Sequence, residues 1–477
     1  MLAARVPATE LPAMSSLSMS SLSRRSFLAA SAVVAAGQSL GATGALGDVD
    51  IAIIGAGAAG IAAARRIAAA GRRFALIEAA DHIGGRCITD TATFDVPFDR
   101  GAHWIHMPDI NPVAKLAPRT GLDIYPAPPG QKMRILRRYA REGEMEDFLA
   151  AQVRANRAIA EAARGNTDVS CAQALPKDLG DWRATIEFVL GPFGCAKDLG
   201  AVSAQDFARS AERDVDAFCR QGFGALLAKL GGGLPVELSA PVSHLELWGR
   251  GVTIDTARGR IAARGAIVTA STGVLAAGKI TFEPALPRRL VDAVNSLSLG
   301  SYDRVVLELP GNPLGLDRDD LVFEKSDGVR TAAMLANIAG SSLVMIDVAG
   351  KFGRDLAAQG PKAMTAFALD WLAGLYGTDL RKAVRRTAAT QWNTEPWVLG
   401  AFSAAAPGAQ PARRALMEPV RDRLWFAGEA VHETLWGTVG GAWESGERAA
   451  DAALKKLGFV AEPREPTPQR PSSRRRR

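Results

Sequence analysis

The chain has 477 residues, of which 48% are hydrophobic and 22% charged, a composition typical of a globular protein too long for one ordinary core. Its formal net charge of +7 is concentrated at the ends, where residues 1–47 hold three Arg against one Glu and residues 461–477 hold six Arg against two Glu. The body between them is nearly neutral and has no apolar stretch long enough for stable membrane insertion, so we expect neither nucleic-acid binding nor a membrane span.

Residues 1–47 have the pattern of an export signal rather than of a folded segment. An adjacent Arg pair, Arg24 and Arg25, is followed by Phe27-Leu28 and then by a mildly apolar stretch of small residues. This order is typical of a twin-arginine signal, a route associated with folded, cofactor-loaded proteins. We therefore expect export and a periplasmic mature protein; a disordered leader or an uncleaved anchor is the alternative interpretation.

Residues 49–78 have the order of a dinucleotide-binding unit. A short apolar strand at 49–54 runs into a glycine-rich turn, an alanine-rich helix follows up to about residue 70, and a second strand at 74–77 ends in an acid. An ordinary glycine turn would lack this combination of flanking strands, helix and acid. The whole arrangement predicts cofactor binding.

Each residue of that turn has a physical task. Gly55 permits the tight turn, and Gly57 lets the backbone approach a pyrophosphate, with Ala59 in the same loop. Gly60 lets the helix pack closely on the strand, and the N–H groups at the helix start face the phosphates. Glu78 is placed to accept hydrogen bonds from an adenosine ribose that carries no 2′-phosphate.

The next segments resemble a known family. Residues 78–86, Glu-Ala-Ala-Asp-His-Ile-Gly-Gly-Arg, resemble the second FAD signature of the flavin-containing amine oxidases, which include monoamine oxidases, polyamine oxidases and lysine-specific histone demethylases. Residues 98–106, Phe-Asp-Arg-Gly-Ala-His-Trp-Ile-His, are similar to the following stretch of polyamine oxidases, which passes beside the flavin ring. The resemblance implies that His106 faces the substrate. It assigns to the cofactor Glu78, Ala79, Gly85, Arg86, Gly101, Ala102, His103 and Trp104.

The middle of the chain adds a strand meander and one departure from the family pattern. Alternating apolar residues after Pro241 predict short antiparallel strands, and the resemblance implies an adenine contact by the backbone of Val242. Many family members have a lysine at the position of Arg304, where it holds a water near flavin N5. Arginine keeps the charge but is bulkier and harder to deprotonate, so it either anchors that water or alters the reaction with oxygen.

Residues 391–403 resemble the aromatic-rich segment of the family. A tyrosine often stands at the position of Phe402 and forms one wall of an aromatic cage over the flavin; Phe402 keeps the π face without the hydroxyl. We expect Trp392 to contact the cofactor and Trp397 and Phe402 to face the substrate amine. The alternative interpretation is that all three are core aromatics.

The last motif lies near the end of the chain. A strand at 424–426 runs into Gly428 and Glu429, which is placed to bind the ribityl or phosphate region. Thr438 and Val439 open a helix whose N–H groups can stabilise negative charge at the flavin N1/O2 end. No Cys lies near this segment, so FAD is expected to be non-covalent. The four cysteines, at 87, 171, 195 and 219, have no metal-ligand spacing, and no metal is predicted.

The resemblance implies an α/β fold in which a Rossmann-like FAD-binding domain is interleaved with an α+β substrate-binding domain. Residues from about 125 to 221, alanine-rich and charged, have a helical period. The expected divisions are a signal at 1–47, the FAD-binding domain at 48–125, 220–300 and 410–460, the substrate domain at 126–219 and 301–409, and a disordered basic tail at 461–477.

The implied chemistry is oxidation of a small-molecule amine to an imine, which water hydrolyses to an aldehyde or ketone plus amine or ammonia, while O2 is reduced to H2O2. The pocket must favour the uncharged amine, and Phe402, Trp397 and His106 are the candidate side chains, with Arg304 near the flavin. Three alternatives stay open: a dehydrogenase passing electrons to a carrier protein, an L-amino-acid oxidase with an Arg for the carboxylate, and a flavin-binding scaffold without turnover.

Overall fold

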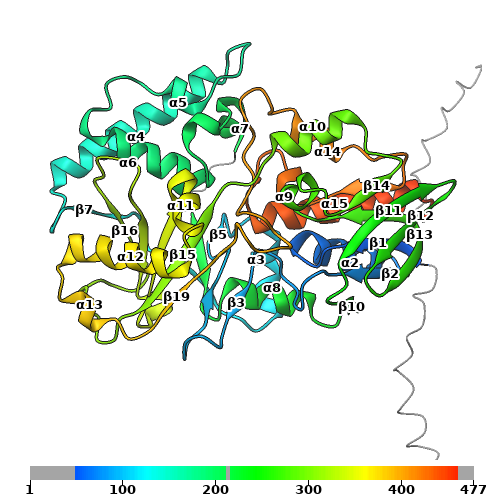
Figure 1. Ribbon diagram of the computed structural model, residues 1–477, viewed down its shortest axis with the longest axis horizontal. Helices are drawn as coiled ribbons and strands as arrows, with labels where there is room; N and C mark the ends of the chain where they lie inside the picture. Colours follow the sequence, from blue (N-terminus) through cyan, green and yellow to red (C-terminus); the bar gives the residue numbers. More distant parts are fainter. Residues whose placement is uncertain (1–48, 211–214, 460–477) are drawn as a thin grey trace, which may run out of the picture. The chain divides into compact units, whose positions relative to one another are not determined.

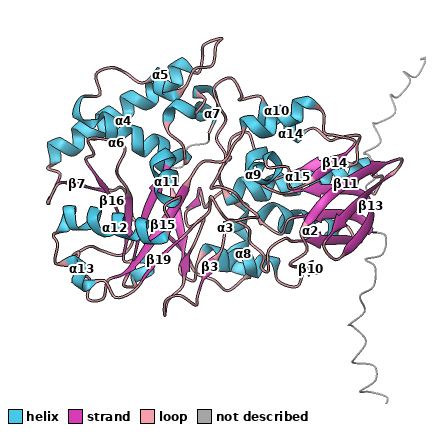
Figure 2. Ribbon diagram, viewed as in Figure 1, coloured by secondary structure: helices cyan, strands magenta, loops and turns pink. Residues whose placement is uncertain are grey.

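The protein is described by a computed structural model that covers residues 49–210 and 215–459 (Figure 1). The predicted export signal and the predicted basic tail therefore lie outside the described residues. Helices and strands are mixed along the described chain (Figure 2), which confirms the predicted α/β class. Within these ranges no helix combines the length and the apolar character needed to cross a membrane.

The predicted strand–turn–helix–strand unit begins an eight-stranded sheet, which we call the first sheet. β1 (Val49–Ile54) pairs in parallel with β2 (Phe74–Ile77) and β13 (Gly259–Val268), and successive buried residues show that both of its faces are covered. The predicted meander forms the antiparallel part. The order is β10 (Val236–Glu237), β2, β1, β13, β12 (Gly251–Thr256), β11 (Val242–Trp248) and β14 (Thr281–Glu283), and β20 (Leu424–Phe426) pairs in parallel with β13.

Two helices from opposite ends of the described chain pack against each other and on the first sheet. They are α2 (Ala58–Ala69) and α15 (Val439–Lys456), and their alanines share a buried cluster with β1 and β20. A Cβ added to Gly446 would lie 2.1 Å from the carbonyl oxygen of Ala59. This distance is impossible for real atoms, so a glycine in α15 permits the close contact with α2.

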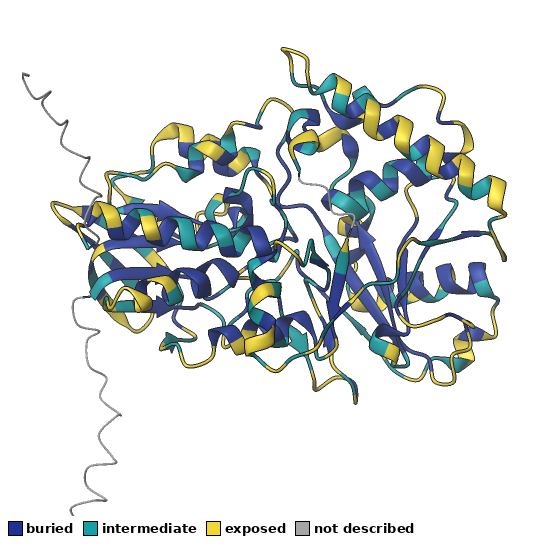
Figure 3. Cartoon of the chain, turned by 180° about the vertical axis from the view of Figure 1, so that it is seen from behind, coloured by how far each residue is buried: buried dark blue, intermediate teal, exposed yellow. Residues whose placement is uncertain are grey.

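A second sheet has seven strands and is mostly antiparallel. Its order is β19 (Thr387–Ala389), β15 (Tyr302–Glu308), β18 (Leu343–Ala349), β17 (Ala333–Ala336), β16 (Asp320–Glu324), β7 (Lys132–Ile135) and β8 (Arg138–Tyr139). Helices α11 (Gly350–Ala357) and α12 (Pro361–Tyr376) bury their apolar faces in the same core cluster as β15 and β18. Figure 3 shows the strands buried and the helices exposed on their outer faces.

The expectation of a helical segment from about 125 to 221 is only partly correct. The long helix α4 (Glu142–Ala162) is present, and it buries Phe148, Ala151, Ala155 and Ile159 on one face. However, β7 and β8 belong to the second sheet, where β7 pairs in parallel with the distant β16. Such pairing between remote segments overrides the local helical composition.

The third sheet has three short strands that connect segments far apart in the chain. β9 (Asp216–Cys219) pairs in antiparallel fashion with β5 (Ile105–His106) and with β6 (Ile124–Pro126). The remaining elements are β3 (Thr89–Asp90), β4 (Phe98–Asp99), α3 (Pro112–Leu116), α5 (Cys171–Ala174), α6 (Arg183–Phe188), α7 (Ala204–Arg209), α8 (Phe223–Gly231), α9 (Thr272–Ala276), α10 (Arg288–Ser296), α13 (Leu380–Ala383) and α14 (Ala412–Met417).

Candidate active site

One large cavity collects the predicted site residues from the start, the middle and the end of the chain. Its volume is about 910 Å³, and its lining comes from both large sheets and from the third sheet. All the predicted residues except Gly60 line it: Gly55, Gly57, Ala59, Glu78, Ala79, Gly85, Arg86, Gly101, Ala102, His103, Trp104, His106, Val242, Arg304, Trp392, Trp397, Phe402, Gly428, Glu429, Thr438 and Val439. Segments separated by hundreds of residues thus form one site.

The glycine turn between β1 and α2 has the close packing expected of it. Gly55 has a φ of +103°, a conformation that favours glycine, and a Cβ on Gly60 would lie 1.8 Å from the carbonyl oxygen of Gly55. Gly60 therefore serves the packing of turn and helix and does not face the cavity. Gly57 is the N-cap of α2 and provides no side-chain cap, so the first N–H groups of the helix are left for an anion in the cavity.

The Glu78 carboxylate at the end of β2 is held by the backbone around it. Its Oε2 accepts from the N–H of Ala56 at 2.6 Å, and its Oε1 accepts from the N–H of Ala80 at 2.9 Å. The side chain is buried and lines the cavity. A carboxylate has about four acceptor positions, so those left over can receive the hydroxyl groups of a ribose, as the sequence predicts.

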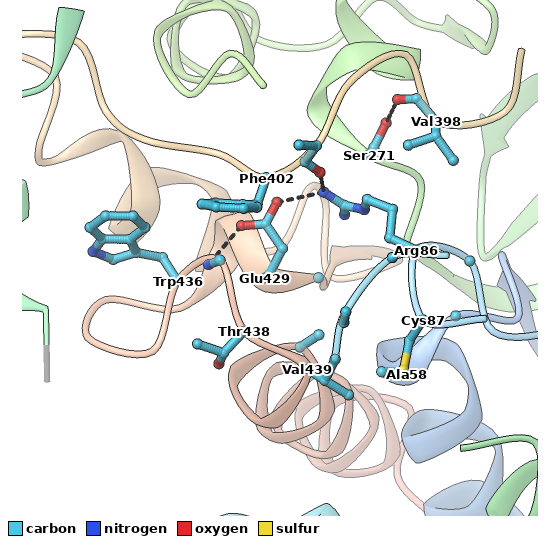
Figure 4. A pocket seen from close by; sticks show the side chains of 18 of the residues that line it. Ala58, Arg86, Cys87, Ser271, Val398, Phe402, Glu429, Trp436, Thr438 and Val439 are labelled. Atoms are coloured by element: carbon cyan, nitrogen blue, oxygen red, sulfur yellow. Dashed lines mark hydrogen bonds and ion pairs between the residues drawn. The ribbon is translucent and has the colours of Figure 1, made fainter. Parts of the chain in front are cut away.

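Glu429 is the centre of a buried hydrogen-bond network (Figure 4). It accepts from Arg86 Nη1 at 2.9 Å, from the hydroxyl of Ser403 at 2.8 Å and from the N–H of Gly437 at 2.9 Å. Burial alone would raise the pKa of Glu429, but the charges of Arg86 and Arg413 outweigh it and lower the pKa. The carboxylate is therefore charged and joins the segments around residues 86, 403 and 437.

A second helix begins at the same cavity. Thr438 is the N-cap of α15, and its hydroxyl accepts from the N–H of Gly441 at 2.9 Å while donating to the carbonyl of Leu435. The N–H groups of Val439 and Gly440 in the first turn have no partner within the helix. Two helix N-termini, of α2 and α15, therefore open on one cavity and favour a ligand with negative charge at two places.

His103 offers an independent sign that the cavity is built to hold a ligand. Its Nδ1 lies 2.8 Å from Asp99 Oδ2, and its ring stacks on Phe218 with 4.7 Å between centroids. Burial opposes ionisation of Asp99, but the hydrogen bond from His103 and those from Thr89 and the backbone lower its pKa. The Nε2 atom of His103 is buried without a hydrogen-bond partner among the described residues. A polar group of a bound cofactor would complete it.

Arg304 lies in the cavity wall, but most of its donors are bound to protein. Its Nε and Nη2 donate to the Asp347 carboxylate at 2.8 and 3.3 Å, and its Nη1 donates to the carbonyls of Asp99 and Gly101 at 2.7 and 3.0 Å. Burial opposes the charge, yet Asp347 raises the pKa of Arg304 above its ordinary value. Arg304 therefore fastens the segment that passes through Gly101 to the second sheet. Its predicted water near the flavin stays a prediction.

Aromatic side chains form another part of the cavity wall. Phe402 lies 6.0 Å from the ring of Tyr302, and Figure 4 shows it beside Trp436. Trp392 is buried and donates from Nε1 to the carbonyl of Arg100 at 3.0 Å, whereas Trp397 is 36% exposed and carries Lys279 over its ring. Trp392 is therefore packed as a core residue and Trp397 lies at the rim of the cavity, and both also line it.

Several lining residues were not predicted from the sequence. Tyr302 stands two positions before Arg304, so the inward alternation of that strand is a signal that could have identified it. Asp216 lies opposite His106 through the pairing of β5 and β9, and its Oδ1 is 2.6 Å from His106 Nδ1. Phe193 and Trp436 also line the cavity, and no local pattern distinguishes them from core aromatics.

Comparison with known proteins agrees with this geometry. A family model described as flavin containing amine oxidoreductase matches residues 58–454. Polyamine oxidase 2 of Arabidopsis thaliana is 26% identical over 433 residues, which cover 84% of this chain and 86% of its own. Lysine-specific histone demethylase 1B of Mus musculus is 25% identical over 438 residues, which cover 83% of this chain and 52% of its own. The chain spans about half the length of such demethylase relatives.

Solved structures share the fold. Cyclohexylamine oxidase from Brevibacterium oxydans superposes with a TM-score of 0.72 at 21% identity, and putrescine oxidase with a TM-score of 0.73 at 20% identity. Each comparison covers 86% of this chain and 100% of the other. The glycine turn, the two helix N-termini and the incomplete His103 all fit FAD. The chain therefore belongs to the flavin-containing amine oxidoreductase family.

Proposed function

We propose that this protein oxidises the carbon–nitrogen bond of a small amine to an imine, which water hydrolyses to an aldehyde or ketone plus amine or ammonia, with O2 reduced to H2O2. The observation that carries the proposal is that two chemically different sets of residues line one cavity. The cofactor side, defined by the turn 55–60, Glu78, Arg86, Glu429 and the start of α15, is polar and charged. The remaining lining, the substrate side, contains Phe193, Tyr302, Phe402 and Trp436.

On the cofactor side, the protein holds and orients FAD. The N–H groups at the starts of α2 and α15 would face its negative charge, and the Glu78 carboxylate would accept from its ribose. Glu429 fixes the Arg86 guanidinium and the Gly437 loop at the distances given above. When bound, FAD supplies the two-electron acceptor for a hydride equivalent from the carbon next to the amine nitrogen.

On the substrate side, the aromatic wall selects the reactive form of the amine. An ammonium ion has no lone pair and is a poor hydride source, and an apolar surrounding disfavours the charged form. The faces of Phe402 and Tyr302 supply such surroundings, while Arg304 keeps its charge compensated by Asp347. No proton-abstracting residue is required when the neutral amine is selected.

Two of the three arginines that line the described cavity are engaged with carboxylates, which leaves Arg100 as the candidate partner for a substrate carboxylate in the amino-acid oxidase alternative. Arg86 binds Glu429 and Arg304 binds Asp347, and a substrate carboxylate would need an Arg with free donors. The dehydrogenase alternative differs only in the final electron acceptor, so it is separated by experiment. Rapid re-oxidation of the reduced flavin by air supports the oxidase, whereas slow re-oxidation with retained amine oxidation supports the dehydrogenase.

The decisive experiment is anaerobic mixing of the FAD-loaded protein with a panel of primary and secondary amines. Loss of the oxidised-flavin absorbance with at least one amine, followed by aldehyde and peroxide on admitting air, is the expected result. A protein that purifies colourless and takes up no added FAD would refute the proposal. So would a flavoprotein whose spectrum no amine changes.

We also propose that the protein reaches the periplasm through the twin-arginine route, on the basis of the Arg24–Arg25 pair and the apolar stretch after it. Substitution of both arginines by Lys should leave the protein in the cytoplasmic fraction with its leader attached. Recovery of that variant in the periplasm would contradict this assignment.

A further inference from the structure

One edge of the first sheet carries five arginines that the proposed function leaves without a task. β1, β2, β13 and β20 are parallel, so their carboxyl ends meet on the cavity side, close to Gly55, Glu78 and Gly428. Their amino ends meet at the opposite edge, where both ends of the described chain lie (Figure 1). We call the five arginines gathered there the basic edge: Arg72, Arg73, Arg250, Arg264 and Arg423.

Strand pairing brings these arginines together from separate segments. Arg73 and Arg264 flank the start of β1, because the N–H of Asp50 donates to the carbonyl of Arg73 at 3.0 Å and the register of β13 places Arg264 on the other side of Asp50. Arg423 comes directly before β20, which pairs with β13. Arg250 lies in the turn between β11 and β12, and the first residues of β12 pair with β13 next to Arg264.

The ring of Phe459, the last described residue, carries two arginines of the basic edge. The guanidinium carbon of Arg72 lies 4.5 Å from the ring centroid, and that of Arg264 lies 4.3 Å from it. The Nε atoms of Arg72 and Arg423 are buried and have no hydrogen-bond partner among the described residues. Two like charges on one ring repel each other and unpaired donors favour an acceptor, so this part of the edge suits anionic oxygen atoms.

Within the described chain, no carboxylate forms an ion pair with the basic edge. Other exposed arginines of this sheet and its helices, such as Arg66 and Arg260, have a carboxylate oxygen at 2.5 and 2.6 Å. Two acids stand near the edge. Asp50 accepts from a backbone N–H at 3.1 Å, and Asp422 pairs with Lys456 at 3.4 Å. The positive charge of the edge is therefore left for a partner from outside the fold.

The surroundings of the basic edge fit an extended anionic surface better than a small anion. None of its arginines lines the large cavity. Trp248, at the end of β11, is 51% exposed, and its Nε1 already donates to Thr253 at 2.6 Å, so its apolar ring is the part that it offers. Exposed Trp beside Arg is typical of membrane interfaces. Residues 461–477, which continue the chain beyond Phe459, hold six Arg against two Glu.

We propose that the basic edge, together with Trp248 and residues 461–477, docks the protein on an anionic phospholipid surface without insertion. The planar guanidinium groups bind lipid phosphates, and the indole ring lies at the level of the headgroups. Export, as proposed above, would bring the protein to such a surface and away from nucleic acid; the inference does not depend on amine oxidation. The cavity lies at the opposite ends of the same strands, so docking leaves it free.

The test is co-sedimentation of the FAD-loaded protein with vesicles of phosphatidylcholine, either alone or with about one third phosphatidylglycerol. We expect binding only to the anionic vesicles, and weaker binding as salt is added. The variant Arg73→Gln/Arg250→Gln/Arg264→Gln removes three exposed arginines of the edge. Each arginine near an anionic surface contributes about 5-fold to the binding constant, so the three substitutions should weaken binding about 100-fold.

A matched variant separates the edge from net charge. Arg119→Gln/Arg137→Gln/Arg154→Gln removes three exposed arginines from other elements and should bind as the wild type does.

Replacement of the three edge arginines by Lys keeps the charge and should also keep binding. Flavin reduction by amines should be unchanged in all three variants, because none of the substituted residues lines the cavity. Wild-type binding by the Gln variant of the edge, equal losses in the two Gln variants, or binding to duplex DNA but not to the anionic vesicles would overturn the inference.

Discussion

Glu429→Gln tests whether the buried carboxylate holds the cofactor side together. Glu429 accepts from Arg86 Nη1, from the N–H and the hydroxyl of Ser403, and from the N–H of Gly437, at distances from 2.8 to 3.2 Å. A Gln side chain has one acceptor oxygen, and its NH2 group would face these donors. Arg86 would also lose its partner charge.

The expected cost follows from that count. A hydrogen bond to a charged group contributes about 1.5–3 kcal/mol, and breaking a buried ion pair costs about 3–5 kcal/mol. We therefore expect Glu429→Gln to lower the free energy of unfolding by about 3–5 kcal/mol and to weaken FAD binding. Urea denaturation of the FAD-free protein, followed by Trp fluorescence, measures the first effect, and titration of the FAD-free protein with FAD measures the second.

The stabilisation by Glu429 should also depend on pH, in a direction set by its lowered pKa. Because the folded state lowers the pKa of Glu429, its stabilisation is present above the unfolded-state pKa of about 4.3 and is lost as the pH falls through the folded-state value. The stability gap between wild type and Glu429→Gln should be full at neutral pH and shrink under strong acid. Glu433→Gln, which breaks surface ion pairs with Arg209 and Arg414, is the matched control, with an expected cost of about 0–1 kcal/mol. Equal stability of the two variants at neutral pH would refute the reasoning.

Two more substitutions test separate contacts. Arg304→Lys puts a single ammonium in place of a planar guanidinium that makes four hydrogen bonds, so Asp347 and the segment around Gly101 are no longer held together. We expect the free energy of unfolding to fall by about 2–4 kcal/mol and FAD binding to weaken. Wild-type thermal stability with unchanged FAD affinity would contradict this. Gly60→Ala places a Cβ 1.8 Å from the Gly55 carbonyl and should abolish FAD binding or folding, whereas Gly71→Ala meets no atom within 4 Å, so its cost comes only from its φ of +66° and should leave FAD bound. The absorbance of bound FAD in the purified proteins shows whether Gly60→Ala has lost the cofactor and Gly71→Ala has kept it.

The sequence predicts the parts of the site that depend on local geometry. The turn at Gly55 and Gly60 needs glycine because of φ and close packing, and Glu78 ends a strand at a defined distance from it. The same applies to Glu429 and Thr438, which flank a strand end and a helix start. In each case the physical requirement involves neighbours in the chain, so a single sequence displays it.

The parts that were missed depend on contacts between remote segments. β7 and β8 lie in a stretch of helical composition, and β7 is a strand because β16 pairs with it. Asp216 reaches the cavity through the pairing of β9 with β5, which no pattern near residue 216 indicates. The sequence predicts that Arg304 belongs to the site, but it does not show that Arg304 donates hydrogen bonds to protein groups. Its acceptors are the Asp347 carboxylate of β18 and the carbonyls of Asp99 and Gly101, which are remote in the chain.

The contact between α2 and α15 has a consequence for how the protein acquires its cofactor. The first helix is synthesised long before the second, yet their N-termini together face one cavity, with Gly446 against Ala59. Until α15 has been synthesised, the nascent chain has only one of the two helix N-termini that face the cavity. Tight capture of FAD therefore requires that α15 has been synthesised and has packed on α2, so cofactor loading reports that these two remote segments have come together.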